Sequence, residues 1–101
     1  MSHPYAAETR SFLNRLLEAG FSLVEVFYDG EEDDRITVNS VKEAVEELSA
    51  TDESFLVALT PEGKRVSLLF VYGNSPGELV ANYTCHPLLD TVVGQHYDQY
   101  N

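Results

Sequence analysis

Two apolar runs separated by a short turn constrain the fold of this chain more than any other feature. Residues 55–60 and 66–72 are rich in β-branched, aromatic and aliphatic side chains, which favour strands. Between them, the segment Thr-Pro-Glu-Gly at 60–63 has proline and glycine at the second and fourth positions of a type I turn. So short a connection joins neighbouring antiparallel strands, and it predicts a hairpin. The near-continuous apolar character of 66–72 predicts a central strand with both faces covered.

The N-terminal part of the chain predicts a helix followed by a second, shorter hairpin. Apolar residues at helical spacing predict a helix over about residues 4–19, opened by Pro4 and ended by Gly20. The polar residues of this segment are expected on its other side: Glu8, Arg10, Asn14, Arg15 and Glu18. Residues 21–28 and 35–38 flank an Asp-Gly turn signal and an acidic run, which predicts a hairpin with its second strand at the sheet edge.

Ser40 and Glu43 have the spacing of a capping box, in which the serine hydroxyl accepts from the Glu43 N–H and the glutamate returns to the Ser40 N–H. An apolar stripe follows at i, i+3, i+4 and i+7, and predicts a helix over about 41–49: Val41, Ala44, Val45 and Leu48.

The C-terminal part predicts two helices. A second capping pattern, Ser75 to Glu78, predicts a short helix containing Leu79, Val80 and Tyr83. Pro87 is expected to open the last helix, and the polar tail 95–101 either frays or packs back. The expected fold is therefore a single α+β domain over 1–101, with a mainly antiparallel sheet and the order α-β-β-α-β-β-α-α. The expected core contains Leu16, Val45, Phe55, Val57, Leu68 and Phe70.

Negative charge is concentrated in one part of the chain. The sequence of 101 residues has 17 acidic and 6 basic residues, a formal net charge of -11. Eleven of the acidic residues lie within 25–53, where Arg35 and Lys42 are the basic ones. Nucleic-acid phosphate and anionic membranes would repel such a protein, so neither is expected as a direct partner. The single cysteine and the absence of a signal-peptide pattern predict the reducing cytoplasm of a bacterial cell.

The chain contains few residues arranged for catalysis or metal binding. Cys85, His86, Asp90 and His96 include metal-ligand types, but they lack the paired spacing of a zinc site. The acidic run from Asp29 does not match a calcium loop, since Asp34 replaces the glycine and Ser40 replaces the final glutamate. We therefore expect no catalytic residue, metal ligand or cofactor, and a protein that is not an enzyme.

The segment 71–84 (Val-Tyr-Gly-Asn-Ser-Pro-Gly-Glu-Leu-Val-Ala-Asn-Tyr-Thr) resembles one found in small phage- and prophage-encoded proteins. In that family a strand ending in Tyr-Gly-Asn precedes a helix, and the resemblance covers about residues 39–90. The related proteins often carry a tryptophan in the preceding strand, which this chain lacks. The resemblance implies an accessory role in a phage or mobile element and no defined chemistry.

These features predict a phage-type accessory protein that binds a host protein, in its sharpest form an acidic, nucleic-acid-mimicking inhibitor of a nucleic-acid-handling or defence system. The expected contact residues are the acidic ones: Glu31, Glu32, Asp33, Asp34, Glu43, Glu46 and Glu47. If these residues share one surface, they would attract a basic partner. Three alternatives stay open: an acidic surface that only maintains solubility, a structural or regulatory homodimer, and a small metal- or cysteine-dependent hydrolase.

Overall fold

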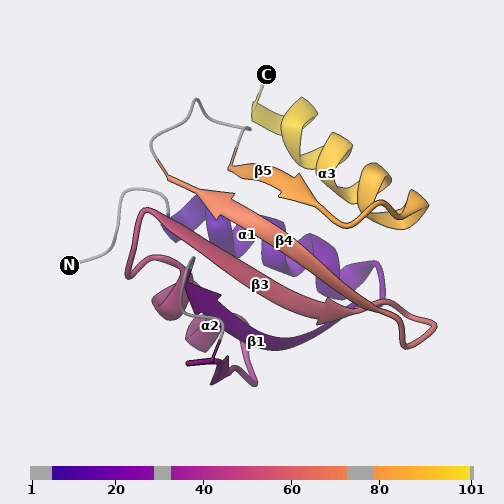
Figure 1. The fold of residues 1–101 in the computed structure, drawn as a ribbon. Coiled ribbons are helices and arrows are strands. Elements are labelled where there is room, and N and C mark those ends of the chain that lie inside the picture. The colour runs from indigo at the N-terminus through magenta and orange to yellow at the C-terminus, as the bar shows by residue number, and fades with distance from the viewer. Residues whose placement is uncertain (1–5, 29–32, 73–78, 101) are drawn as a thin grey trace.

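The computed structural model describes residues 6–28, 33–72 and 79–100. Within these residues the chain is α+β, with helices packed on an antiparallel sheet, as the sequence predicts. The elements in chain order are α1 (Ala6–Glu18), β1 (Ser22–Tyr28), β2 (Ile36–Thr37), α2 (Val41–Leu48), β3 (Glu53–Leu59), β4 (Arg65–Val71), β5 (Val80–Tyr83) and α3 (Pro87–Tyr100) (Figure 1).

The sheet has the strand order β2-β1-β3-β4-β5, and every pairing is antiparallel. The β3–β4 hairpin is confirmed, with pairs running from Glu53↔Val71 to Leu59↔Arg65. Its turn closes through the Gly63 N–H, which donates to the Thr60 carbonyl at 2.8 Å. Gly63 has φ +88°, a conformation that a residue without a Cβ adopts at little cost. The short β2 lies at the sheet edge, as expected.

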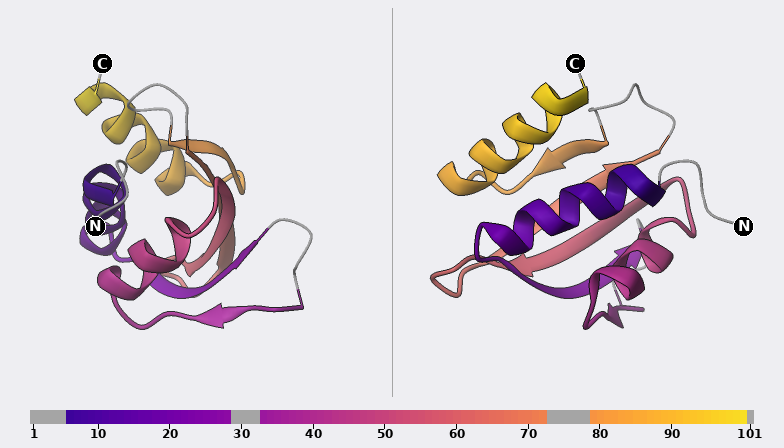
Figure 2. Two further views of the ribbon diagram at one scale, coloured as in Figure 1. Left: turned by 90° about the vertical axis from the view of Figure 1, so that its left-hand side faces the viewer. Right: turned by 180° about the vertical axis from the view of Figure 1, so that it is seen from behind.

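All three described helices lie on one face of the sheet (Figure 2). Their apolar sides form a single core with the inward residues of the strands, and Leu16, Val45, Leu68 and Phe70 belong to it. Phe55 and Val57 do not, because the alternation along β3 turns them to the opposite face. Val57 is buried there all the same, whereas Phe55 is half-buried, so its assignment to the core was wrong.

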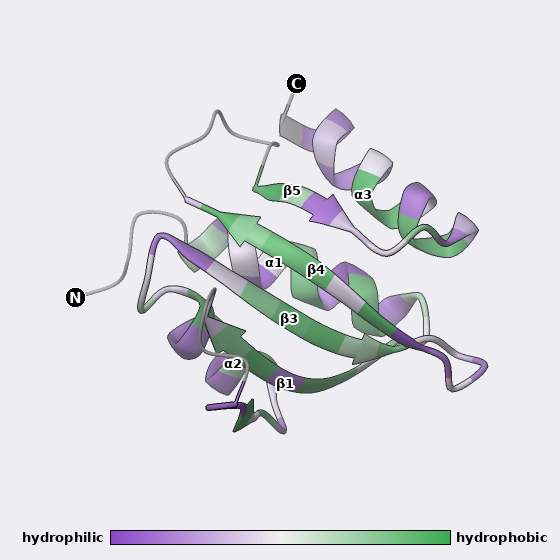
Figure 3. Cartoon of the chain, viewed as in Figure 1, coloured by the Kyte–Doolittle hydropathy of each residue, from purple (hydrophilic) through white to green (hydrophobic). Residues whose placement is uncertain are grey.

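Strand β4 is an interior strand, but only its inner face is covered. Its burial alternates strictly, with Val66, Leu68 and Phe70 buried and the residues between them half-buried. The expectation that both faces are covered was therefore wrong. The sequence suggested it because apolar residues continue along β3 and β4, as the colouring in Figure 3 shows.

The largest departure from the expected element order is β5. Residues 80–83 form a strand that pairs with β4, where the sequence predicted a helix. The pairs Phe70↔Val80 and Leu68↔Tyr83 place both side chains against the core. Val and Tyr favour a pleated surface, and a helix this short is not stable by itself. The predicted Ser75–Glu78 cap and the Asp29-Gly30 turn lie outside the described residues.

Among the described residues, those that the sequence predicts to begin or end the helices are found at those positions. Gly20 has φ +98° and follows the end of α1. The Glu43 N–H donates to the Ser40 hydroxyl at 3.2 Å, which caps α2. The return bond differs from the expectation, because the Glu43 carboxylate accepts from the Asn39 N–H at 3.2 Å. Pro87 opens α3, and the polar tail continues this helix to Tyr100.

Candidate functional site

The structure separates the acidic residues that the sequence grouped together. Asp33 and Asp34 are exposed just before β2, whereas Glu43 and Glu46 are exposed on α2. The hairpin of β1 and β2 projects on the side of the sheet opposite the helices (Figure 2). The two acidic groups therefore face different directions. Glu47 accepts a hydrogen bond from the Tyr28 hydroxyl at 3.0 Å, and Glu31 and Glu32 lie outside the described residues.

The β1–β2 hairpin lies beside an apolar surface on the face of the sheet that no described helix covers. Phe27 and Phe55 stack at its centre, with ring centroids 4.9 Å apart and planes 12° from parallel. The Arg35 guanidinium lies over the Phe27 ring, 4.6 Å from its centroid, in a cation–π contact. We call this surface, formed by Phe27, Phe55, Val57 and Leu69, the open face.

An ion cluster crosses the open face beside these rings. The Glu25 carboxylate on β1 pairs with Arg35 and also with Arg65 on β4, the latter at 3.0 Å. The hydrogen bond from Arg35 is the main reason that the pKa of Glu25 is lowered. Val57, which pairs with Glu25 in the β1–β3 register, is 2% exposed. Because one carboxylate pairs with two guanidinium groups, the cluster itself is net positive. The negative charge at this face comes from the exposed acids around it, Asp33, Asp34 and Glu53.

A groove of about 230 Å³ continues the open face towards the edge strand β5. It is lined by Phe55, Ser67, Leu69, Asn82, Tyr83 and Thr84. The Thr84 hydroxyl accepts from the Ser67 N–H at 3.0 Å, which fixes the end of β5 against β4. The groove therefore offers an apolar floor with hydroxyl and amide groups at one end.

The residues weighed for metal binding or catalysis are not assembled. His86 accepts a hydrogen bond from the Leu88 N–H at 3.2 Å and so caps α3. Asp90 accepts from the Tyr83 hydroxyl at 2.7 Å, and Cys85 is exposed. Among the described residues there is no cluster of three or more His, Cys, Asp or Glu side chains able to hold a metal ion.

His96 takes part in a buried polar cluster that the sequence did not reveal. Its Nε2 lies 2.9 Å from the Glu8 carboxylate, and the two residues are 1% and 8% exposed. Beside them the hydroxyls of Thr9 and Tyr72 are hydrogen-bonded at 2.9 Å. Glu8 was expected on the solvent side of α1 and is buried instead. Its spacing of four from Phe12 and eight from Leu16 was the available signal.

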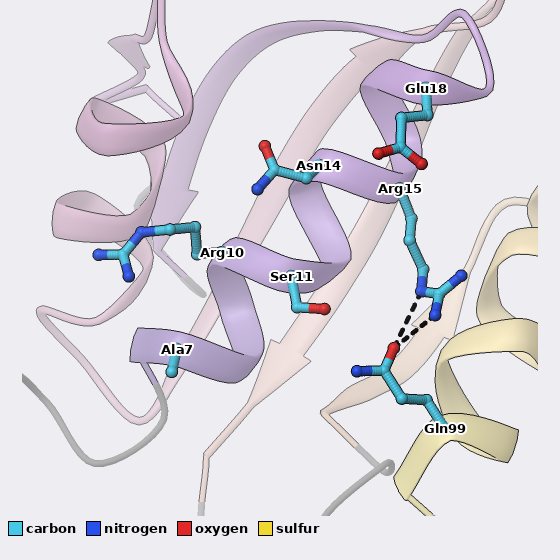
Figure 4. Close-up of a pocket in the computed structure, with 7 residues that line it drawn as sticks. All are labelled: Ala7, Arg10, Ser11, Asn14, Arg15, Glu18 and Gln99. Atoms are coloured by element: carbon cyan, nitrogen blue, oxygen red, sulfur yellow. Dashed lines mark hydrogen bonds between the residues drawn. The ribbon is translucent and has the colours of Figure 1, made fainter.

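The outward side of α1 forms a second, polar groove, which has a volume of about 520 Å³ (Figure 4). Arg15 reaches across it from α1 and donates to the side-chain oxygen of Gln99 on α3, at 3.2 Å from Nε. Arg10, Asn14 and Glu18 are exposed along the same helix. This groove carries two of the chain's basic residues, Arg10 and Arg15.

In the part of the chain that the structure describes, no helix combines the length and apolarity needed to span a membrane. In comparisons with known proteins, no family model, curated protein or solved structure matches this chain.

Proposed function

We propose that this protein is a non-enzymatic binding protein that holds a basic segment of another protein on its open face. The observation that carries the proposal is the position of Asp33 and Asp34, exposed on a hairpin that projects on the same side as a partly exposed apolar surface. An apolar centre with a polar, charged rim is the usual composition of a protein-binding surface.

The apolar centre would supply most of the affinity. Phe55 and Leu69 are half-buried on strands whose backbone is fixed by the sheet, so little ordering is needed when a partner binds. The neighbouring groove of about 230 Å³ is suited to one apolar side chain of the partner. The hydroxyls of Ser67 and Thr84 lie at its end and could accept or donate hydrogen bonds to the partner backbone.

The acidic rim would supply the orientation and the speed of binding. Asp33, Asp34 and Glu53 are exposed near the tip end of the β1–β2 hairpin, and the pairing of Tyr28 with Ser54 places Glu53 beside it. Rim charges act chiefly on the association rate and on the choice of partner. They favour a partner rich in lysine and arginine.

A narrower form of the proposal is the acidic inhibitor. A protein whose own ligand is nucleic acid carries the kind of basic surface that this rim would attract. In that case duplex DNA added at low salt should compete for the same partner. The phage-type accessory role belongs to this narrower form, and it rests on the sequence resemblance of the segment 71–84 alone, since residues 80–83 form a strand here and not the helix of that family.

The proposal is tested by an NMR titration of the full chain with a lysine-rich peptide that carries one leucine. Chemical-shift changes are expected at Phe55, Leu69 and Thr84, and not along α2. A peptide with glycine in place of leucine should bind more weakly, because it loses the contact in the groove.

Two charge variants of equal net charge locate the rim. Asp33→Lys combined with Asp34→Lys should weaken peptide binding about tenfold, an effect typical of several rim charges acting together. The matched control, Glu46→Lys combined with Asp98→Lys, makes the same change of net charge on the helical side and should have a much smaller effect. Equal weakening by both variants, or shift changes confined to α2, would show that the open face is not the binding site.

A further inference from the structure

The outward side of α1 has a charge pattern that is complementary to itself. Arg10 and Glu18 are both exposed, and neither forms an ion pair with another described residue. Asn14 lies midway between them in the sequence and is also exposed. Residues spaced by four are neighbours on a helix surface, so the three side chains follow one ridge that winds around α1 by about 40° per step.

A two-fold axis at Asn14 would bring opposite charges together. Arg10 and Glu18 lie eight residues apart, about 12 Å along the helix axis at a rise of about 1.5 Å per residue. If a second α1 runs antiparallel to the first, is centred on Asn14 and crosses it at the angle that aligns the two ridges, each Arg10 faces the Glu18 of the other copy. The same pairing occurs twice, as an isologous contact requires.

Other features of α1 are compatible with such a contact. Ala7 and Ser11 are small and line the groove of about 520 Å³, which leaves room for a neighbouring helix. Leu17 is 43% exposed, the most exposed large apolar side chain of this helix, and would face Ser11 of the second copy. Arg15 is held against Gln99 and stays within its own chain (Figure 4).

The groove on α1 is not acidic, although Glu43 and Glu46 of α2 are exposed on the same side of the sheet. Two copies with a net charge of -11 each repel one another over most of their surfaces. The groove on α1 contains Arg10, Arg15 and Glu18 and is locally positive. Contact through this groove keeps the acidic hairpins of the two copies on the outer sides, far from the shared axis (Figure 2).

We propose that a second copy of this chain packs antiparallel on α1, with Arg10 of each copy paired to Glu18 of the other. The dimer would present two open faces in opposite directions, because the helices cover only the inner side of each sheet. This inference does not depend on the proposed function, since it uses different residues.

Analytical ultracentrifugation of the full chain over a range of concentrations tests the dimer. Arg10→Glu and Glu18→Arg should each raise the dissociation constant by about tenfold or more, because each replaces two attractions by two repulsions. An equimolar mixture of the two variants should recover the dimer. In the mixed dimer the acid introduced at position 10 of one chain meets the base introduced at position 18 of the other, and the unchanged Glu18 and Arg10 still pair.

Matched controls separate this contact from the effect of net charge. Lys64→Glu and Glu62→Arg make the same charge changes on the exposed β3–β4 turn and should leave the dissociation constant unchanged. Circular dichroism would confirm that the α1 variants remain folded.

Three outcomes would overturn the inference. The first is a wild-type protein that stays monomeric at about 1 mM, where a dimer with a Kd of that size would be half associated. The second is a dimer that survives both single substitutions. The third is a mixture that associates no better than its components. Loss of peptide binding on the open face would leave all three measurements unaffected, so the two proposals can fail separately.

Discussion

Individual buried polar residues contribute to this fold in a way that the apolar pattern does not reveal. Glu8 and His96 come from α1 and α3, and their side chains meet 2.9 Å apart in the interior. His96 also packs edge-on against Phe12, with ring centroids 5.2 Å apart. The pair therefore ties the C-terminal helix to the N-terminal one through both a hydrogen bond and a ring contact.

Replacing Glu8 should destabilise the protein substantially. Glu8→Ala is expected to lower the free energy of unfolding by about 3 kcal/mol, because it removes the carboxylate that contacts a buried histidine. Glu8→Gln keeps the size and an acceptor and should cost less. Urea unfolding gives both values, with Glu46→Ala on α2 as an exposed control expected within about 0.5 kcal/mol of wild type. A loss in Glu8→Ala no larger than that of the control would contradict this role.

Tyr72 should make the protein sensitive to alkaline pH. Burial raises the pKa of its phenol, partly offset by the hydrogen bond with Thr9, and the nearby Glu8 charge adds to the increase. A raised pKa means that the folded state holds the phenolic proton more tightly than the unfolded state does. The contribution of this group to the free energy of unfolding is therefore fully present below the unfolded pKa of about 10, and it is lost as the pH rises through the folded pKa. The pKa of Tyr83 is raised as well, mainly by its hydrogen bond to Asp90, and acts in the same direction.

The free energy of unfolding should therefore fall above about pH 10. Tyr72→Phe should make this decrease less steep while leaving the part due to Tyr83. Urea titrations at several pH values would measure the slope, and an identical slope in the variant would contradict the assignment to Tyr72.

Among the elements, α2 has the clearest local determinant. Ser40 has extended backbone angles, φ -149° and ψ 162°, and its hydroxyl accepts from the Glu43 N–H. The apolar stripe of this helix then buries Ala44, Val45 and Leu48 against α1, β1 and β3. The cap and the stripe act together, since the cap fixes where the helix begins and the stripe fixes how it docks.

Ser40→Ala should cost about 1 kcal/mol of stability through loss of the cap. Ser40→Asp retains an acceptor at the same position and should remain close to wild type. Denaturant midpoints of the three proteins would be compared. Equal midpoints for the alanine and aspartate variants would show that the hydroxyl does not stabilise the helix.

The elements also show the limit of local signals. Residues 80–83 have helix-compatible spacing, yet they form β5 because Leu68, Leu69 and Phe70 on β4 offer backbone partners. An irregularity between Leu69 and Phe70 shifts the register, which is a common feature at sheet edges.

Across the whole molecule, the fold assigns separate roles to the two sides of the sheet. The helices cover one side, and the ion cluster and aromatic stack cover the other in part. The acidic hairpin projects over the second side. This arrangement predicts that binding on the open face depends on ionic strength.

Raising the salt concentration from about 0.1 M to about 1 M should slow the association of the lysine-rich peptide, because the screening length falls from about 10 Å to about 3 Å. The dissociation rate should change less, since the apolar contact in the groove is not screened. Stopped-flow measurements would separate the two rates. An association rate independent of salt would remove the acidic rim from the mechanism.

The features that could be predicted from the sequence are those whose cause lies within a few residues. The 60–63 turn, the Ser40 cap, the Gly20 stop and the opening of α3 at Pro87 all follow from local backbone preferences, and all are confirmed. The α+β class also follows, because the apolar periodicity of each segment restricts it to a helix or a strand.

The side of the sheet that each strand residue faces, and the distant groups that meet, depend instead on the tertiary structure. Phe55 belongs to the open face because all described helices pack on the other side of the sheet. Glu8 is buried because it contacts His96, which lies 88 residues further along the chain. The acidic residues were divided because a hairpin and a helix leave the sheet in opposite directions. Each of these results depends on contacts between segments far apart in the chain, and local periodicity carries no information about them.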